Sequence, residues 1–444
     1  MTGKTQINKA KTPLIGFISL GCAKNQVDLE RLAGKLFGEP FAFTKEPSEC
    51  DILIINTCGF IKNAVDEAIE AILSMRQQIP EHAKLIVFGC MTERYRLEIA
   101  KELPEIDFFA GVGEEAHKEV INYISSLYSE PITLHHGRYL FNAPYYAYLK
   151  IAEGCNNRCT YCTIPSIRGC LVSVPATDLL EEAKSLANSG VKEIIIVSQD
   201  SSKYGHDRSD GVYLPNLIDL LAHALPDIYF RIMYLNPDGV TEELIDMVGL
   251  HKNIWRYFDI PVQHGSDKIL TAMNRHSTRT DIERVFAMIR RKLPDAFIRT
   301  TVIVGFPGET EADFTEIKEF LEVCTPDFAG FFPYSPEEGT VAAAMGDMVP
   351  EKVIKGRLKT LQSIQKKNTL KRLRGCAKGE ITCFVERSND DFDFILEGRA
   401  HFQAPEIDGM LYVTDGVATK GYGPYRAKIT KVAYPDLYVE LIDG

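Results

Sequence analysis

The chain has 444 residues, of which 45% are hydrophobic and 25% charged, and its formal net charge is −11. This length exceeds one ordinary hydrophobic core and predicts two or three domains. The acidic balance disfavours tight, sequence-independent binding to nucleic acid, which requires a basic surface. No apolar run reaches the roughly 18 residues that a membrane span requires, so no membrane association is expected.

The N-terminal run MTGKTQINKAKTP is basic but contains no apolar core, so it is not expected to act as a signal peptide. The chain has eleven cysteines. In a chain without an export signal they favour a reducing, cytoplasmic location, where clustered cysteines are more often metal ligands than disulfides. The positions of the cysteines relative to the predicted strands are therefore informative.

Residues 14 to 125 alternate short apolar runs with amphipathic helical patterns, which predicts a parallel sheet. Strands are predicted at 14–20, 51–56 and 84–88, and helices at 28–37, 63–78 and after Thr92. The run 51–56 is short and nearly all apolar, as is typical of a parallel strand buried on both faces. We predict an α/β domain with a Rossmann-like parallel sheet over residues 12–125.

One cysteine follows each of these three strands: Cys22, Cys58 and Cys90. The carboxyl ends of parallel strands lie at one edge of a sheet, and open α/β sheets bind ligands at that edge. The topology therefore predicts that the three thiols form one metal site. The alternative is that they serve as small apolar core residues. Cys50 precedes its strand and is predicted to point elsewhere.

The segment Cys155-Asn156-Asn157-Arg158-Cys159-Thr160-Tyr161-Cys162 has the spacing C-x3-C-x2-C. Thiolates select zinc or iron–sulfur clusters. Three ligands are one fewer than a closed structural site takes, so a position is left open for chemistry. Spacing alone also allows a zinc site whose fourth ligand lies elsewhere, or three cysteines that bind no metal.

A strand–helix unit repeats six times between residues 141 and 340. Strands are predicted at 146–152, 193–198, 229–234, 257–262, 298–304 and 328–332, and helices at 177–188, 217–224, 241–248, 266–273, 281–291 and 311–323. Six units are fewer than the eight of a closed barrel. We therefore predict a partial (βα)6 barrel over residues 141–373, with a lateral opening that suits a large substrate and functional residues at the strand carboxyl ends.

Two loops at such strand ends contain candidate binding residues. Gln199 and Asp200 follow the second strand, and Gly305 and Gly308 follow the fifth. Glycine lets a flat ligand approach the backbone closely. The alternative for both glycines is a tight turn before the helix that begins near Thr310.

The last part of the chain, residues 376–444, is predicted to form a small β-barrel of OB type. Its five short strands are predicted at 379–387, 393–396, 410–414, 425–432 and 437–442. It contains seven Lys or Arg and twelve Asp or Glu. This acidic balance is poorly suited to phosphates and favours a basic protein partner. Cys376 and Cys383 lack metal-ligand spacing and are predicted to be inert.

The cysteine motif, with Tyr161 before its last cysteine, resembles the signature of radical S-adenosylmethionine (SAM) enzymes. Residues 19–28 (SLGCAKNQVD) and 56–58 (NTC) resemble the N-terminal domain of the methylthiotransferases, a family of these enzymes, and residues 403–409 (QAPEIDG) resemble their TRAM domain. The resemblance implies two 4Fe–4S clusters, each with one open iron. One would bind SAM and the other would carry the sulfur to be transferred. The implied ligands are Cys155, Cys159 and Cys162 for the first cluster, and Cys22, Cys58 and Cys90 for the second.

The resemblance also implies contacts to SAM. Tyr161 would lie near the adenine, and the loop of Gln199 and Asp200 would bind the methionine amino group. Gly305 and Gly308 would let the adenine approach the backbone. His264 and Arg275 also match family motifs, but we assign them no chemical role.

The motifs CAKN at residue 22, QD at 199 and QAPE at 403 favour the branch of the family that modifies an aspartate of the twelfth small-subunit ribosomal protein, a basic protein. In that branch a 5′-deoxyadenosyl radical removes hydrogen from the β-carbon, a methylated sulfur is then transferred, and a second SAM supplies the methyl group. An electron donor is required, and a monomer is expected.

Two alternatives remain at this point. One is a methylthiotransferase that acts on a tRNA adenosine next to the anticodon. The other is a non-enzymatic iron–sulfur electron carrier or ribosome-binding factor, against which the open cysteine sites argue. A helical connector at 352–374 contains nine Lys or Arg, which form either a solvated helical face or a patch that contacts the ribosome.

Overall fold

The structure is a computed structural model that describes residues 12–38, 40–128, 132–135, 137–141, 145–389 and 395–443. The chain separates into two compact units. The first comprises 1–142, 153–172 and 337–340, and the second comprises 143–152, 173–336 and 341–444. The segment 153–172, which contains the C-x3-C-x2-C motif, therefore belongs to the first unit.

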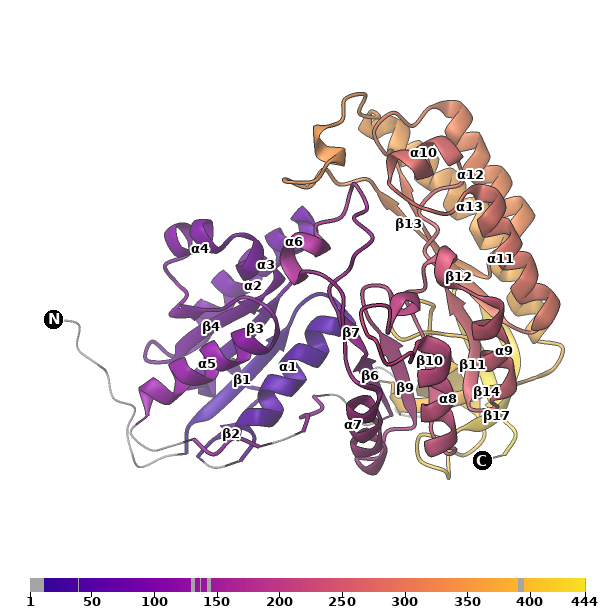
Figure 1. The fold of residues 1–444 in the computed structure, drawn as a ribbon. Coiled ribbons are helices and arrows are strands. Elements are labelled where there is room, and N and C mark those ends of the chain that lie inside the picture. Colours follow the sequence, from indigo (N-terminus) through magenta and orange to yellow (C-terminus); the bar gives the residue numbers. More distant parts are fainter. Residues whose placement is uncertain are drawn as a thin grey trace. The chain divides into compact units, whose positions relative to one another are not determined.

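The first unit is built on a five-stranded parallel sheet with the order β2-β1-β3-β4-β5 (Figure 1). Its strands are β1 (Leu14–Ser19), β2 (Ala42–Phe43), β3 (Ile52–Thr57), β4 (Lys84–Gly89) and β5 (Phe108–Phe109). The three predicted strands are present and lie side by side in the sheet. The two-residue edge strands β2 and β5 were not predicted, because so short a strand shows no periodicity in the sequence.

Helices cover both faces of this sheet. They are α1 (Ala23–Leu36), α2 (Lys62–Gln78), α3 (Cys90–Arg94), α4 (Arg96–Glu102) and α5 (Gly113–Leu127), and a short turn of 3-10 helix, η1 (Pro47–Glu49), precedes β3. Ile52 and Ile54 pack in one core with α1 and α5, whereas Leu53 and Ile55 pack in a second core with α2. Successive residues of a strand point to opposite faces, so a strand covered on both sides must be apolar throughout.

Two helices of the first unit differ from the prediction. Helix α1 begins at Ala23 rather than at Asp28, and Cys22 occupies its N-cap position with extended backbone angles. Helix α5 was not predicted, although Ala116, Val120 and Ile124 follow its buried face at helical spacing.

The segment 153–172 is closed at its base by the short strand pair β7 (Ala152–Glu153) and β8 (Val172–Ser173). Within it lies helix α6 (Ile164–Arg168), which packs against α3 of the same unit. Packing of α6 places the residues that follow the cysteine motif next to the helix that begins at Cys90.

The second unit contains a six-stranded parallel sheet with the order β13-β12-β11-β10-β9-β6. Its strands are β6 (Tyr146–Lys150), β9 (Glu193–Val197), β10 (Tyr229–Ile232), β11 (Ile254–Asp259), β12 (Phe297–Val304) and β13 (Phe328–Pro333). Its helices are α7 (Ala176–Asn188), α8 (Leu214–Ala224), α9 (Glu242–Leu250), α10 (Asp267–Ala272), α11 (Arg279–Lys292) and α12 (Glu311–Cys324), and the turns η2 (Ser201–Lys203), η3 (Pro237–Gly239) and η4 (Ala342–Ala344) lie in its loops. All neighbouring strands pair in parallel, and β6 and β13 form the two edges, which confirms the predicted partial barrel.

A long helix, α13 (Glu351–Cys376), leads into a closed five-stranded barrel with the order β14-β15-β16-β18-β17. Its strands are β14 (Glu380–Ser388), β15 (Leu396–Ala400), β16 (Leu411–Asp415), β17 (Tyr425–Ala433) and β18 (Asp436–Leu441). The closed barrel confirms the predicted OB-type module. The strand predicted at 393–396 is misplaced, because β15 only begins at Leu396; residues 393 and 394 lie outside the described residues.

Buried ion pairs attach this small barrel to the sheet of the second unit. Glu193 of β9 accepts hydrogen bonds from Arg231 of β10 and from Arg399 of β15, both at 2.7 Å. Arg399 also donates to Glu386 of β14 at 2.5 Å. Because breaking one partner of a buried ion pair leaves an uncompensated charge, this network ties the two parts of the unit together.

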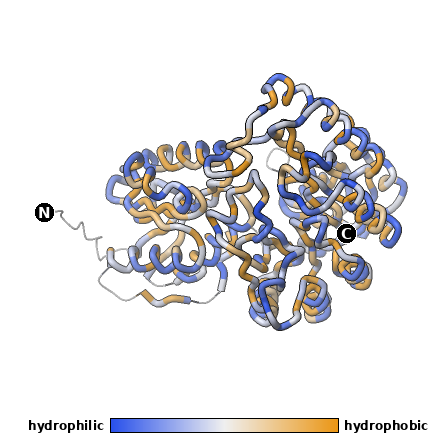
Figure 2. The backbone as a smooth tube through the Cα atoms, turned by 45° about the horizontal axis from the view of Figure 1, so that its top comes forward, coloured by the Kyte–Doolittle hydropathy of each residue, from blue (hydrophilic) through white to orange (hydrophobic). Residues whose placement is uncertain are grey.

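In each unit the buried strands are largely apolar, whereas apolar and hydrophilic residues alternate along the helices (Figure 2). In the described part of the chain, no helix is both long enough and apolar enough to cross a membrane.

Candidate active site

The three cysteines of the first unit lie where parallel topology predicts. Cys22 follows β1, Cys58 directly follows β3, and Cys90 directly follows β4 and begins α3. Strands β1, β3 and β4 are neighbours in the sheet. The three thiols therefore share one sheet edge, with Cys90 buried and the other two half-buried.

Two glycines allow the loops after these strands to approach closely. Gly21 has a φ of +93°, and a Cβ atom there would lie 2.6 Å from the Cβ atom of Cys58. Gly89 has a φ of +117°, and a Cβ atom there would lie 2.5 Å from the carbonyl oxygen of Thr57. No other residue type fits such a conformation and such a spacing together.

Asn25, in the first turn of α1, connects the loops around the three thiols. Its side-chain nitrogen donates to the carbonyl oxygens of Leu20 and Thr57, at 3.0 and 3.1 Å. Its side-chain oxygen lies 3.9 Å from Sγ of Cys22 and 3.7 Å from Sγ of Cys90. One amide therefore fixes the loop after β1 against the loop after β3 and contacts two of the three thiols.

Arg168, at the end of α6, is the second residue that organises this edge. Its Nε donates to Sγ of Cys90 at 3.3 Å, and one Nη donates to the side-chain oxygen of Asn25 at 2.6 Å. The other Nη donates to Asp28 at 3.0 Å and to Glu153 at 2.9 Å. Its side chain is 2% exposed. Arg168 therefore links the segment that contains the C-x3-C-x2-C motif to the edge that contains Cys90.

Burial and the neighbouring positive charges act in opposite directions on the pKa values of the three thiols. Burial raises the pKa of Cys58, and it raises the pKa of Cys90 to about 11 even though the charge of Arg168 opposes it. For Cys22 burial also acts upward, but the charges of Lys24 and Arg168 and nearby backbone N–H groups outweigh it and lower the pKa.

Ionised Cys22 raises the pKa of both other thiols, so the three groups interact electrostatically. Three thiolates would carry more negative charge than one guanidinium offsets. A cationic metal centre supplies the missing positive charge, and three thiolates are a donor set that suits an iron–sulfur cluster. The residues at this edge therefore fit such a cluster.

The other three cysteines, Cys155, Cys159 and Cys162, occupy one loop and are all half-buried. The backbone N–H of Cys155 donates to the carbonyl oxygen of Gly169, and that of Cys162 to the carbonyl oxygen of Cys159, both at 3.1 Å. Tyr161 lies half-buried in the same loop. The loop thus presents three accessible thiols from a short span of backbone, which also fits a cluster with an open position.

The remaining predicted residues lie in the second unit. Asp200 is buried, and one of its carboxylate oxygens accepts hydrogen bonds from the N–H and the hydroxyl of Ser202, at 3.1 and 2.5 Å. This carboxylate therefore caps η2, a structural role that the sequence did not indicate. Gln199, directly before it, is half-buried.

Gly305 and Gly308 both have positive φ angles, +83° and +76°. A Cβ atom at Gly305 would lie 2.4 Å from the side chain of Ile354 on α13, whereas one at Gly308 would meet nothing within 4 Å. The turn and the approach of α13 account for Gly305 without a ligand. Gly308 leaves its backbone open to a flat group.

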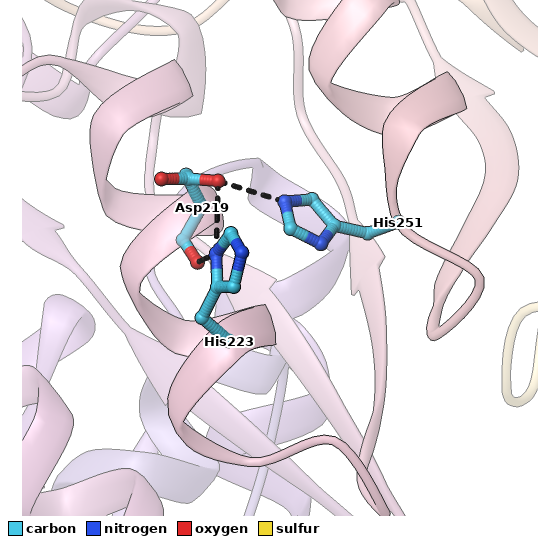
Figure 3. Close-up of side chains that lie close together, drawn as sticks. All are labelled: Asp219, His223 and His251. Atoms are coloured by element: carbon cyan, nitrogen blue, oxygen red, sulfur yellow. Dashed lines mark hydrogen bonds and ion pairs between the residues drawn. The ribbon is translucent and has the colours of Figure 1, made fainter.

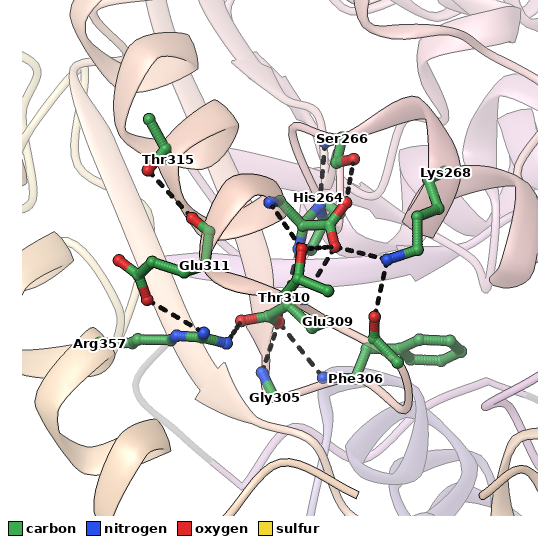
Figure 4. A network of polar contacts seen from close by, with 12 residues as sticks. His264, Ser266, Lys268, Gly305, Phe306, Glu309, Thr310, Glu311, Thr315 and Arg357 are labelled. Carbon is green, nitrogen blue, oxygen red and sulfur yellow. Dashed lines mark hydrogen bonds and ion pairs between the residues drawn. The ribbon is translucent and has the colours of Figure 1, made fainter. Parts of the chain in front are cut away.

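Glu309 holds this turn in place (Figure 4). Its Oε2 atom accepts hydrogen bonds from the backbone N–H groups of Gly305 and Phe306, at 2.6 and 3.3 Å, and lies 3.5 Å from Nε2 of His264. Its Oε1 atom accepts from Arg357 of α13 at 2.5 Å. Burial acts to raise the pKa of Glu309, but His264, Gly305 and Arg357 outweigh it and lower the pKa. The motif histidine therefore positions a carboxylate.

A second carboxylate, that of Asp313, supports the other end of the turn. Asp313 accepts hydrogen bonds from Lys268 at 2.7 Å, Ser266 at 2.8 Å and the N-cap residue Thr310 at 2.6 Å. Lys268 also donates to the carbonyl oxygen of Gly308 at 2.8 Å. The loop after β12 is therefore rigidly held before any ligand binds. The sequence motif indicated its glycines but not these supporting residues.

A group of potential metal ligands lies elsewhere in the second unit, formed by Asp219, His223 and His251 (Figure 3). The Asp219 carboxylate lies 2.8 Å from His251 and 3.1 Å from His223. Helix α8 ends at Ala224, before β10, so the group lies at the amino-terminal edge of the sheet. Pairing with Asp219 accounts for the group, and it is not part of the candidate active site.

Family models match three successive parts of the chain. Residues 15–111 match "Uncharacterized protein family UPF0004", residues 149–321 match the radical SAM superfamily, and residues 379–442 match the TRAM domain.

Curated relatives are similar to the chain over nearly its whole length. A protein of Aquifex aeolicus is 42% identical over 95% of this chain and 96% of its own length. A protein of Geobacter sulfurreducens is 40% identical over 96% of this chain and 98% of its own length. Both are named ribosomal protein uS12 methylthiotransferase RimO.

Among solved structures, the radical SAM methyltransferase TsrM of Kitasatospora setae has a similar fold. Its structure with cobalamin and a 4Fe–4S cluster superimposes with a TM-score of 0.54 at 15% identity, over 73% of this chain and 77% of that chain. A second structure of the same protein, with tryptophan and a SAM analogue, gives a TM-score of 0.55 at 14% identity, over 72% of this chain and 73% of that chain.

Replacing Arg168 by Met should destabilise the first unit, because the carboxylates of Asp28 and Glu153 would lose their cation inside the protein. Loss of one partner of a buried ion pair costs about 3–5 kcal/mol. We expect a lower unfolding temperature of the apoprotein and less iron retained after reconstitution. The control is Arg96→Met, an arginine of the same unit whose ion pair with Glu119 is exposed; this variant should change neither the unfolding temperature nor the retained iron. Equal behaviour of the two variants would contradict a positioning role for Arg168.

Glu309→Gln should lower the free energy of unfolding by about 3 kcal/mol, since it leaves a buried guanidinium without its carboxylate. A lowered pKa in the folded state gives a stabilisation that is complete above the ordinary carboxyl pKa and is lost as the pH falls. The difference from the wild type should therefore shrink below about pH 4. Urea unfolding at several pH values measures this.

The matched control is Glu311→Gln, which removes an exposed carboxylate 3.2 Å from the same arginine, Arg357. An exposed pair contributes only about 0–1 kcal/mol. If both glutamine variants lost the same stability, the buried position of Glu309 would not matter.

Proposed function

The chain belongs to the ribosomal protein uS12 methylthiotransferase family, and we propose that its own substrate is an aspartate of uS12, a protein of the small ribosomal subunit. The observation that carries this proposal is the roughly 40% identity to relatives of that name over nearly the whole chain. The chain is a radical SAM methylthiotransferase, and its cofactors are SAM and 4Fe–4S clusters. The tRNA-modifying and non-enzymatic alternatives are not retained.

We further propose that Cys155, Cys159 and Cys162 hold the cluster that binds SAM. The second cluster would be held by the other three cysteines, Cys22, Cys58 and Cys90. When bound, SAM and the clusters supply a radical that removes hydrogen from the substrate carbon and the methylated sulfur that replaces it. A carbon–hydrogen bond of this kind has too little acidity for general base catalysis, so the chain itself needs no acid–base pair.

The contribution of the chain is then to bind, orient and shield these groups. Arg168 offsets thiolate charge and fixes the segment 153–172 against the sheet edge, and Asn25 fixes the loops at that edge. The backbone at Gly308, rigidly supported by Glu309 and Asp313, suits a flat adenine, and Tyr161 and Gln199 are proposed as further SAM contacts. For Asp200 we propose a role through the shape of its loop, since its carboxylate caps η2.

The remaining features of the proposal follow from the substrate. The C-terminal barrel has a net charge near −5, which suits a basic ribosomal protein. We propose that the enzyme works in the cytoplasm as a monomer and receives electrons from a separate donor protein. The domains proposed for these tasks are 12–125, 141–373 and 376–444, and each contains one of the three family matches.

The assignment of the two cysteine groups predicts different defects in single variants. Cys58→Ala and Cys159→Ala should each reduce the iron content from about eight to about four atoms per chain, because each removes a ligand of one 4Fe–4S cluster. Only Cys159→Ala should abolish SAM cleavage, whereas Cys58→Ala should cleave SAM without methylthio transfer. Cys170→Ala, at an exposed cysteine, is the control. Intact SAM cleavage in Cys159→Ala would refute the assignment.

The substrate is tested by mass spectrometry of the small-subunit ribosomal proteins, with total tRNA in parallel, from cells with and without the gene. We expect the methylthio mass increment to disappear from one aspartate of uS12. Loss of methylthio-adenosine from tRNA, with uS12 unchanged, would overturn the proposed substrate.

A further inference from the structure

Helix α13 is strongly basic in a protein that is acidic overall. Nine Lys or Arg lie between residues 352 and 374, while the only acidic residue of the helix is Glu351, at its first position. The chain as a whole has a net charge of −11. Positive charge is therefore concentrated on one element.

The nine residues divide into two sets. Arg357 and Arg372 turn inward and pair with buried carboxylates, Arg357 with Glu309 at 2.5 Å and Arg372 with Asp327 at 3.2 Å. Both arginines belong to the packing of α13, so the solvated-face interpretation is wrong for them. The other seven are exposed: Lys352, Lys355, Lys359, Lys366, Lys367, Lys371 and Arg374.

These seven residues, which we call the basic face, lie on one side of the helix. At 3.6 residues per turn they fall within roughly half of the helix circumference, and at 1.5 Å per residue they extend over about 33 Å. The other exposed residues on that side are uncharged, among them Gly356, Thr360, Gln362 and Ser363. The basic face is therefore a continuous stripe without an interrupting acid.

Most of the basic face is not neutralised by the protein itself. Lys355 pairs with Glu351 at 2.6 Å, and Lys366 lies over the ring of Tyr434. In the part of the chain that the structure describes, Lys352, Lys359, Lys367, Lys371 and Arg374 have no carboxylate within ion-pair distance. Elsewhere on the surface, lysines commonly pair with acids, as Lys184 does with Glu181.

We propose that the basic face binds the phosphate backbone of ribosomal RNA, so that the enzyme engages uS12 on the assembled small subunit. This inference rests on the proposed function. A ribosomal protein in its assembled state is surrounded by RNA, and a protein with a net charge of −11 is repelled by that polyanion unless it presents a local basic surface. An unpaired stripe about 33 Å long provides several phosphate contacts at once.

The test uses the cluster-loaded enzyme in which Lys352, Lys359, Lys367 and Lys371 are all replaced by Gln. Binding to purified small subunits is measured by sedimentation over a range of salt concentrations. If each lysine contacts one phosphate, the slope of log K against log salt should become less steep by about 3. The affinity near 0.15 M salt should fall at least about tenfold.

The matched control replaces four exposed lysines on other elements, Lys45, Lys101, Lys118 and Lys252, by Gln. It changes the net charge by the same amount and should keep wild-type binding. Equal losses in both variants would show a net-charge effect and overturn the proposal. Unchanged binding in the α13 variant would also overturn it.

Activity separates this inference from the proposed function. With free uS12 as substrate, the α13 variant should match the wild type in kcat/KM; with small subunits as substrate, its KM should rise while kcat is unchanged. A loss with free uS12 as well would indicate contact with the protein substrate and contradict RNA binding. A wild-type enzyme that modifies neither form would instead refute the proposed function.

Discussion

The buried guanidinium of Arg168 is the interaction on which the organisation of the first unit depends. Several thiols and two carboxylates converge on one sheet edge, and their negative charges repel each other in a medium of low dielectric constant. Arg168 contacts Cys90, Asp28 and Glu153 directly. Arg168 follows the C-x3-C-x2-C motif in the chain. Its positive charge offsets the negative charge near Cys90, and its contacts also fix the segment that contains Cys155, Cys159 and Cys162.

The second unit also contains buried ion pairs, which there hold loops and strands in place. Buried pairs such as Glu309 with Arg357 and Glu193 with Arg399 each join elements that are far apart in sequence. Buried ion pairs contribute little net stability, because desolvation offsets their attraction, but they strongly disfavour any arrangement that separates the partners. Their effect is therefore to fix the loop after β12 and the C-terminal barrel in one position relative to the sheet.

The sequence predicted the sheets, the sheet edge with three cysteines and the small barrel, because these depend on local periodicity and on parallel topology. It did not predict the roles of Arg168, Asn25 or Glu309. Their partners are distant in the chain: Arg168 and Asn25 are 143 residues apart, and Glu309 and Arg357 are 48 residues apart. Nothing in the local pattern distinguishes such a buried side chain from a solvated one. The same limit applies to the capping of η2 by the Asp200 side chain, a contact that the motif did not indicate.

Charge is distributed unevenly over the second unit. The C-terminal barrel has a net charge near −5, while the neighbouring helix α13 is basic along its exposed side. A surface charge of one sign would attract either a basic protein or a polyanionic RNA and would repel the other. A ribosomal protein embedded in RNA presents both a basic protein and a polyanion to an approaching enzyme, and complementary fields raise association rates chiefly when each patch faces its opposite. An acidic barrel beside a basic helix would therefore match both parts of such a substrate, the basic protein and the RNA around it.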